Sequence, residues 1–341
     1  MKYALVFLSL FIGTLAISQT ELTEKDVKKM QKKFLKTKDY VFVPSVTIRR
    51  ESDDQDVPYK MIKKPREISI DSFYIDKFEL SNWEYLLYID FLKQTHPDLV
   101  DAAMPDTTVW RDKYAYYEPY VEYYLRHPAY RSYPVVGVSF NQAIDYCKWA
   151  TKSYNHYPDR IFKEILIRLP TEEEWQYAAR SGGEYQALPW RGNSVFDDEG
   201  ELMANFGYVS QIAIYKDSLW RFDARRDTFV KKEFLLSEGV GSENTDILAP
   251  VDAYYPNAFG LYNMAGNVEE FVISTAGGTS NTYDYFMSGD TISNDSSGIT
   301  RGGSWRDPGA YMRTNVRQFY SGRDYSSAEI GFRLVLEVVE Y

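Results

Sequence analysis

Residues 250–272 contain the side chains whose types and spacing come nearest to a recognisable chemistry. Asn263, Gly266, Asn267 and Glu270 fall within eight residues. Amide and carboxylate oxygens, together with carbonyls exposed where a glycine bends the backbone, are the hard ligands that Ca²⁺ prefers. The spacing differs from that of an EF-hand loop. The same residues are also typical of a loop tied by side-chain-to-backbone hydrogen bonds without a metal, so spacing alone leaves both interpretations open.

The segments around this stretch predict a mixture of strands and helices that would hold it in place. Apolar alternation and β-branched composition predict strands at 40–49, 66–78, 135–139, 165–169, 300–305 and 330–339. Helices are expected to begin after the capping residues Ser81, Ser139 and Thr171. Long polar stretches separate these segments. The pattern therefore indicates an α+β protein with little regular secondary structure.

Composition excludes several functional classes. The net charge is −10 and the isoelectric point is near 5.0, which argues against binding to a nucleic-acid backbone. Cys147 is the single cysteine, so the chain forms no internal disulfide, and we expect it to be a buried apolar residue of a helix. Only three histidines occur, which argues against a histidine-rich transition-metal centre.

The N-terminus carries the pattern of an export signal. Lys2 precedes an apolar run, and residues 16–18 fit a small-x-small cleavage site, so 1–18 is predicted to be a signal peptide. A membrane anchor is the alternative, but the run is shorter than the roughly 20 residues that span a bilayer. We expect an N-terminal helical arm at 19–39 and one domain at 40–341. The protein would then lie in the periplasm or at the periplasmic face of an outer membrane.

Two insertions interrupt the predicted domain, near 96–133 and 207–247. The first is rich in tyrosine and has two interpretations. It could form an aromatic surface for a protein partner, or a long loop held down by its own rings. The tendency of long ordered loops to pack on themselves favours the second interpretation. Because aromatic residues are favoured at binding hot spots, the insertion is also the first candidate for a partner surface.

Several fragments resemble one family, in the same order along the chain. They are Phe73–Asn82, Pro134–Ser139, Arg168–Arg180, Pro189–Gly192, Ala204–Phe206, Gly260–Glu270, Arg301–Trp305 and Gly331–Leu334. Together they resemble the formylglycine-generating enzyme, or sulfatase-modifying factor, domain over residues 40–340. The resemblance implies an irregular α+β fold related to C-type lectins.

The resemblance also implies structural Ca²⁺. One family site corresponds to Asn263, Gly266, Val268 and Glu270, the middle two through their carbonyls. A second begins at Asn205 and Phe206, and Glu243 or Asp246 are guesses for its remaining ligands. Glu269 stands where the family usually has tryptophan, so the packing around this loop must differ.

The catalytic centre of the family does not carry over. Its oxidase members use two cysteines that bind copper and oxidise a substrate cysteine, and the matching positions here are Asp307 and Met312. Neither side chain supplies a thiolate, so we expect no copper. Another branch uses histidine-bound iron from an added domain that has no counterpart here. The resemblance therefore implies the scaffold of the family without its chemistry.

A narrower resemblance, over residues 104–138, is to the gliding-motility and type IX secretion proteins GldJ and GldK, although no lipidation cysteine follows the signal. It favours a non-catalytic scaffold that binds protein partners in an envelope-associated assembly. One alternative is a diverged oxidoreductase acting on a peptide, with Asp307, Arg306, Arg313 and Arg317 lining the groove. Another is a Ca²⁺-dependent glycan-binding protein.

Overall fold

The computed structural model gives the arrangement of the central part of the chain. It describes residues 39–50, 66–111, 117–183, 186–192, 194–197, 199–207, 220–223, 228–231, 247–275 and 298–341, and isolated positions 25, 29 and 32. The predicted signal peptide, most of the predicted arm and most of the second insertion lie outside these residues. The predicted division into domains stays a prediction.

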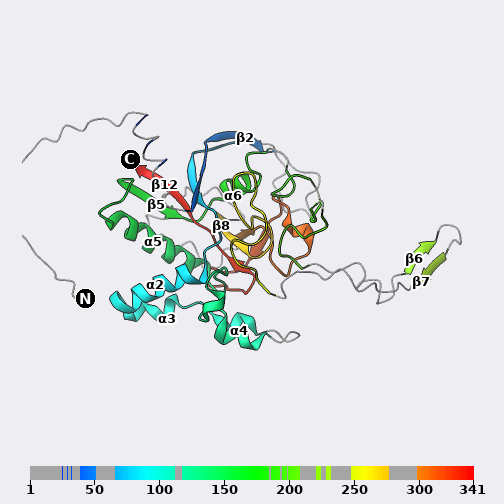
Figure 1. Cartoon of the computed structure of the whole chain (residues 1–341), viewed down its shortest axis with the longest axis horizontal. Coiled ribbons are helices and arrows are strands. Elements are labelled where there is room, and N and C mark those ends of the chain that lie inside the picture. Colours follow the sequence, from blue (N-terminus) through cyan, green and yellow to red (C-terminus); the bar gives the residue numbers. More distant parts are fainter. Residues whose placement is uncertain are drawn as a thin grey trace, which may run out of the picture.

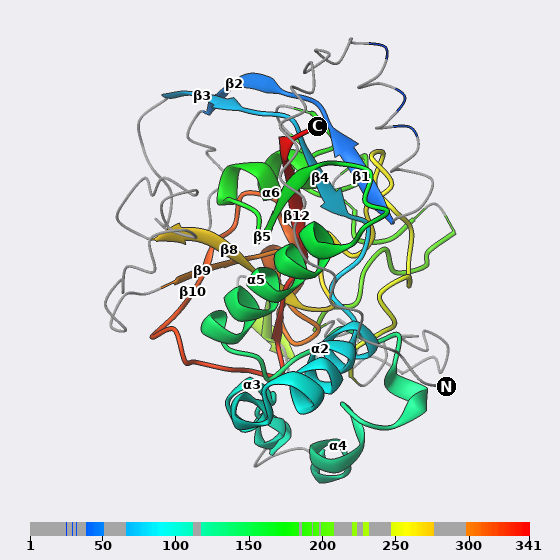
Figure 2. The same ribbon diagram turned by 90° about the vertical axis from the view of Figure 1, so that its left-hand side faces the viewer.

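One four-stranded sheet joins the two halves of the chain. Its order is β1 (Tyr40–Val43), β4 (Phe73–Asp76), β12 (Val335–Glu340) and β5 (Glu164–Arg168), and all neighbours are antiparallel. Figure 1 labels β5 and β12, and Figure 2 labels all four strands. The C-terminal strand β12 thus lies between two strands from the first half. Its first residues, Val335 and Leu336, are almost completely buried.

A second four-stranded sheet carries the residues around the candidate site. Its order is β10 (Gln318–Tyr320), β9 (Gly298–Arg301), β8 (Glu269–Thr275) and β11 (Ile330–Gly331), and only the β11–β8 pair is parallel. Two hairpins complete the described strands: β2 (Val46–Arg50) with β3 (Arg66–Ile70), and β6 (Trp220–Asp223) with β7 (Thr228–Lys231).

Three helices begin at the residues that the sequence predicts. These are α2 (Asn82–Thr95), α5 (Phe140–His156) and α6 (Glu172–Ala179), and each starts with a complete capping box. Helix α5 lies along β5 (Figure 2), to which its side chains bind: the Thr151 hydroxyl and the Asn155 amide each exchange two hydrogen bonds with that strand. Helices α3 (Val100–Ala103) and α4 (Glu118–Tyr123) and several 3-10 turns fill the first insertion.

The predicted strand at 135–139 is wrong. The backbone N–H of Val135 donates to the carbonyl of Leu80, that of Gly137 donates to Ser327, and the carbonyl of Gly137 accepts from Asp106. These bonds go to three different segments, so no ladder forms. Pro44 likewise separates the predicted strand at 40–49 into β1 and β2.

The tyrosine-rich insertion packs on its own rings, as loop packing predicts. Trp110 is 2% exposed, and its ring contacts Tyr117, Tyr120, Tyr124 and Trp305. Trp110 and Tyr124 are buried, so the described rings of this segment pack at least in part against one another inside the molecule. Cys147 is completely buried on α5, as expected, and burial raises the pKa of its thiol.

Candidate functional site

The loop before β8 adopts a backbone that explains its asparagines and glycine. Asn263 and Asn267 have φ angles of 50° and 63°, a left-handed conformation that asparagine tolerates better than most residues. Gly266 has φ 74°, and a Cβ there would lie 2.2 Å from the carbonyl oxygen of Asn205. This position requires glycine because another chain segment passes directly over it.

The two asparagine side chains converge on one buried carboxylate. The Nδ2 of Asn263 donates to Glu79 at 2.9 Å, and the Nδ2 of Asn267 donates to both oxygens of Glu79 at 3.1 Å. Glu79 is fully buried. Burial, followed by the nearby charge of Glu270, raises the pKa of Glu79 to about 8. Glu79 was not among the predicted site residues.

Glu270 is held by a cation from the chain itself. Its two oxygens accept hydrogen bonds from the Nε and Nη2 of Arg333 at 2.7 and 2.6 Å, and Trp175 donates a third at 2.7 Å. All three side chains are fully buried. These contacts make Glu270 one half of a buried ion pair, and its three hydrogen bonds leave about one acceptor position of the carboxylate. The amide nitrogen of Asn263 is also engaged, and calcium at this loop stays a prediction.

The second predicted calcium position is different, because it retains an oxygen atom that could bind a cation. The Nδ2 of Asn205 donates to the carbonyl of Ile247 at 2.9 Å and to the Oδ1 of Asn267 at 3.3 Å. The Oδ1 of Asn205 is buried, yet it accepts no hydrogen bond from the described residues. A buried acceptor of this kind fits a cation ligand.

The other residues predicted for this second site give less support to a bound calcium ion. The side chain of Phe206 packs in a small apolar cluster with Leu188, Ala204, Ala265 and Met312. Glu243 and Asp246 lie outside the described residues. Within the described parts of the chain, no three His, Cys, Asp or Glu side chains are grouped to hold a metal ion.

The two positions that the resemblance assigns to the family cysteines, Asp307 and Met312, make structural contacts. Met312 is completely buried in the cluster with Phe206, and a Cβ on Gly303 would lie 2.5 Å from its methyl group. The carboxylate of Asp307 accepts hydrogen bonds from the N–H and hydroxyl of Ser304 at 2.8 and 2.7 Å, and so fixes the turn that follows β9. Neither residue can act as a thiol nucleophile.

An acidic pocket of about 380 Å³ lies beside Asp307. Gln318 bridges two carboxylates there: its Nε2 lies 2.7 Å from Glu269 and 3.0 Å from Asp307. The hydroxyl of Thr300 also donates to Glu269. Burial and the charge of Asp307 raise the pKa of Glu269 to about 8. The sequence marks this residue only as a glutamate where the family has tryptophan.

Two of the three arginines that were proposed to line the groove form ion pairs elsewhere. Arg317 is buried and pairs with Glu172, which also pairs with Arg301. Arg306 pairs with Glu329 at 3.4 Å, and its guanidinium lies over the Trp305 ring at 4.6 Å. Of the four residues proposed for the groove, Asp307 lines the pocket, whereas Arg306 and Arg317 serve structural ion pairs.

No helix in the described part of the chain combines the length and apolar character needed to cross a membrane.

Comparison with known proteins identifies the scaffold. The model of the sulfatase-modifying factor enzyme 1-like domain matches residues 23–338. The mouse formylglycine-generating enzyme is 27% identical over 259 residues, which cover 67% of this chain and 56% of that protein. The enzyme of Thermomonospora curvata is 28% identical, covering 69% and 70%. The mouse inactive C-alpha-formylglycine-generating enzyme 2 is 26% identical over 292 residues, covering 79% and 76%.

Solved structures show the same fold. PvdO from Pseudomonas aeruginosa superimposes with a TM-score of 0.54 at 19% identity, covering 87% of this chain and 94% of that one. CarF gives 0.52 at 17% identity, covering 87% and 97%. The chain spans little more than half the length of the mouse and bovine enzymes that it matches. On the strength of the domain match, this chain belongs to the formylglycine-generating enzyme, or sulfatase-modifying factor, family.

Proposed function

We propose that this chain is a non-catalytic member of its family that binds protein partners. The observation that carries the proposal is the state of the two cysteine positions. Met312 is sealed in the core, and Asp307 holds a turn and faces a second carboxylate. Oxidation of a substrate cysteine through an enzyme thiolate requires a nucleophile that these side chains cannot supply.

A named relative supports this direction. The chain aligns with the mouse inactive C-alpha-formylglycine-generating enzyme 2 over more of its length than with the mouse formylglycine-generating enzyme. Together with the export signal expected at 1–18 and the resemblance of residues 104–138, this supports a scaffold of an envelope assembly of the gliding-motility or type IX secretion kind. We propose that the protein lies in the periplasm or at the periplasmic face of the outer membrane.

The surface that we assign to the partner lies on α2. Trp83, Leu87 and Phe91 recur every four residues along this helix and are 46%, 44% and 40% exposed. Residues at this spacing form one continuous stripe. In the first insertion, the other candidate for this role, Trp110 and Tyr124 are buried against neighbouring rings, although Tyr123 is 50% exposed. The occupant we assign to the stripe is an apolar segment of a protein partner.

The loss of thiol chemistry is tested first. The purified chain, supplied with copper and a cysteine-containing peptide, should show no oxygen uptake above that of the Asp307→Asn variant. Peptide turnover that is lost in this variant would instead support the diverged oxidoreductase.

The partner surface is tested by site-specific photo-crosslinking at position 87 in the native envelope. We expect one dominant crosslinked protein, whose crosslink disappears when Trp83 and Phe91 are both replaced by serine. The same replacement at Val339, an exposed apolar residue of β12, is the control and should leave the crosslink intact. A pattern that is the same in all three backgrounds would refute the assignment of α2.

A further inference from the structure

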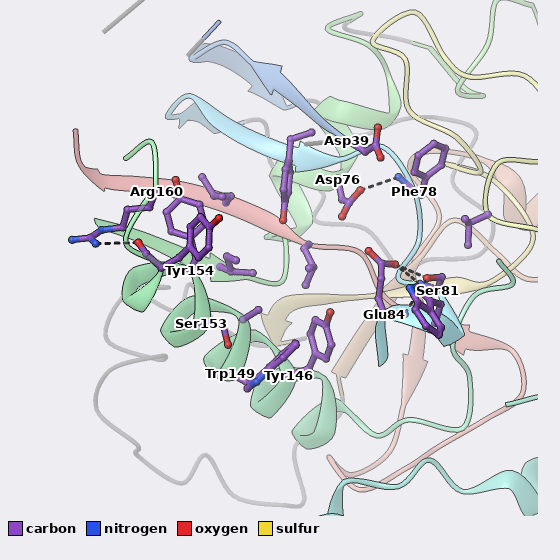
Figure 3. A pocket seen from close by; sticks show the side chains of 18 of the residues that line it. Asp39, Asp76, Phe78, Ser81, Glu84, Tyr146, Trp149, Ser153, Tyr154 and Arg160 are labelled. Carbon is purple, nitrogen blue, oxygen red and sulfur yellow. Dashed lines mark hydrogen bonds between the residues drawn. The ribbon is translucent and has the colours of Figure 1, made fainter. Parts of the chain in front are cut away.

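A large cavity lies away from the pocket at Asp307 and shares none of its lining residues. Its volume is about 1110 Å³, and it opens between the ends of β1 and β4, the start of α2, and one face of α5 (Figure 3). Cavities of roughly 300–1,000 Å³ hold drug-sized molecules. This one therefore offers space for an organic ligand of moderate size.

Aromatic rings form much of its wall. Tyr146, Trp149 and Tyr154 project from α5, three and five residues apart, and Tyr40 and Phe78 line the cavity from the sheet side. Tyr146 and Trp149 also pack on each other, with ring centroids 5.3 Å apart, so this part of the wall is fixed before any ligand binds. Tyrosine and tryptophan faces are negative and attract a cation that lies over them.

Two carboxylates face each other at one side of the cavity. Asp76 ends β4 and Glu84 lies in the first turn of α2, and Figure 3 shows their side chains pointing toward one another. One oxygen of Glu84 accepts from the N–H and hydroxyl of Ser81 at 2.9 and 2.6 Å. Asp76 accepts only a long bond of 3.4 Å, from the N–H of Phe78. Among the described residues, no side-chain cation pairs with either carboxylate.

The cations nearest to the cavity are committed elsewhere. Arg333 gives its guanidinium to Glu270 and to backbone carbonyls, including that of Asp76. Lys77 pairs with Asp39 at 3.6 Å, and Arg131 lies over the Trp83 ring. Arg160 donates to the carbonyls of Tyr157 and Lys163. Burial, followed by the charge of Glu84, raises the pKa of Asp76 well above its usual range, although the charge of Arg333 acts in the opposite direction.

We propose that this cavity binds an organic amine, with its ammonium group between Asp76 and Glu84 and its apolar body against the rings of α5. An ammonium supplies the hydrogen-bond donors and the positive charge that the two carboxylates lack. A metal ion fits less well, because among the described residues no third His, Cys, Asp or Glu joins the two carboxylates in a group that could hold one. A carboxylate or phosphate would add a third negative charge.

Three small probes of similar shape and different charge test the proposal by titration calorimetry on the whole chain. They are phenethylamine, the neutral 2-phenylethanol and the anionic 3-phenylpropionate. We expect the amine to bind about tenfold more tightly than the alcohol, since a charge-assisted hydrogen bond is worth roughly one order of magnitude in affinity. We expect no measurable binding of the anion. Equal affinity for amine and alcohol would overturn the proposal.

Matched variants locate the binding to this cavity. Asp76→Asn should weaken amine binding about tenfold, and Glu84→Gln should do so while keeping the capping box, which glutamine also completes. Asp90→Asn removes a charge from the exposed side of the same helix and should leave the affinity unchanged. Should Asp76→Asn fail to fold, Ser153→Trp obstructs the cavity from α5 and should abolish binding. Amine binding that survives in the folded cavity variants would refute the site.

Discussion

The guanidinium of Arg333 donates hydrogen bonds of 2.6 and 2.7 Å to the carboxylate of Glu270, and both side chains are fully buried. The pair joins β8 to the segment that leads into β12, an inner strand of the other sheet. A second buried pair, between Arg168 and Glu174, fixes the start of α6. Several residues that carry the family resemblance are therefore members of buried ion pairs.

Arg333→Met should destabilise the protein by about 3–5 kcal/mol, because it leaves the Glu270 charge buried without its partner. Urea denaturation gives the free energy of unfolding. Lys93→Met is the control, since Lys93 pairs with Asp90 in solvent and such pairs are worth about 0–1 kcal/mol. A loss of similar size in both variants would show that the buried pair has no special role.

Trp110→Ala should cost about 3–5 kcal/mol, because it removes the ring around which the tyrosine-rich insertion packs. Tyr123→Ala, which removes a half-exposed ring of the same insertion, should cost about 0.5 kcal/mol or less. The two values come from thermal or urea unfolding. If the insertion docks on a partner and not on itself, the order of the two effects in the isolated protein will not hold.

The stability of the protein should fall as pH rises from about 5 to about 8. The pKa of Glu269 is about 8 in the folded protein against an ordinary value of 4.5, so in this range the folded state holds a proton that the unfolded state has lost. Stability then decreases with pH by up to about 1.4 kcal/mol per unit for each such group. Glu79, with a pKa of about 8, acts in the same direction.

Glu269→Gln should make this pH dependence shallower, since glutamine has no proton to lose. The measurement is the urea midpoint at several pH values between 5 and 8. Glu118→Gln, which removes a carboxylate that is exposed in the folded protein, is the control and should keep the parent slope. A slope that is the same for parent and Glu269→Gln would contradict the assigned role of Glu269.

Calcium should raise the melting temperature, and chelation of the holo protein should lower it. Saturation at about 100 times the Kd corresponds to roughly 2.7 kcal/mol if only the folded state binds. Asn205→Ala should remove the response, because its buried Oδ1 is the available donor. Glu270→Gln distinguishes the two loops, since a response that it abolishes would assign the ion to the 263–270 loop instead. A melting temperature that does not change on addition of chelator would contradict calcium binding at either loop.

Local structure could be predicted from the sequence where neighbours along the chain determine it. The capping boxes of α2 and α6 need only residues three positions apart, such as Ser81 with Glu84, and both formed as predicted. The error at 135–139 has the opposite origin. Its apolar composition suits a strand, but strands form only where a partner lies alongside, and here the partners are three separate loops.

The buried networks could not be predicted in the same way. Glu79 lies 184 positions before Asn263, and Glu270 lies 63 before Arg333, so local patterns contain no trace of either contact. The sequence identified Glu270 as important through the family motif, but its salt bridge with Arg333 emerges only from the fold. Glu269 was recognisable as an exception to the motif, whereas its proximity to Asp307 was not.

The complete burial of Cys147 has a practical consequence. Its thiol lies on the buried face of α5, and burial raises the pKa of that thiol, so we expect it not to react with maleimide reagents. A cysteine engineered at Leu87 would then be the sole labelling position. A dye or spin label attached there would report directly on a partner that binds to α2, and Cys147 would not have to be replaced first.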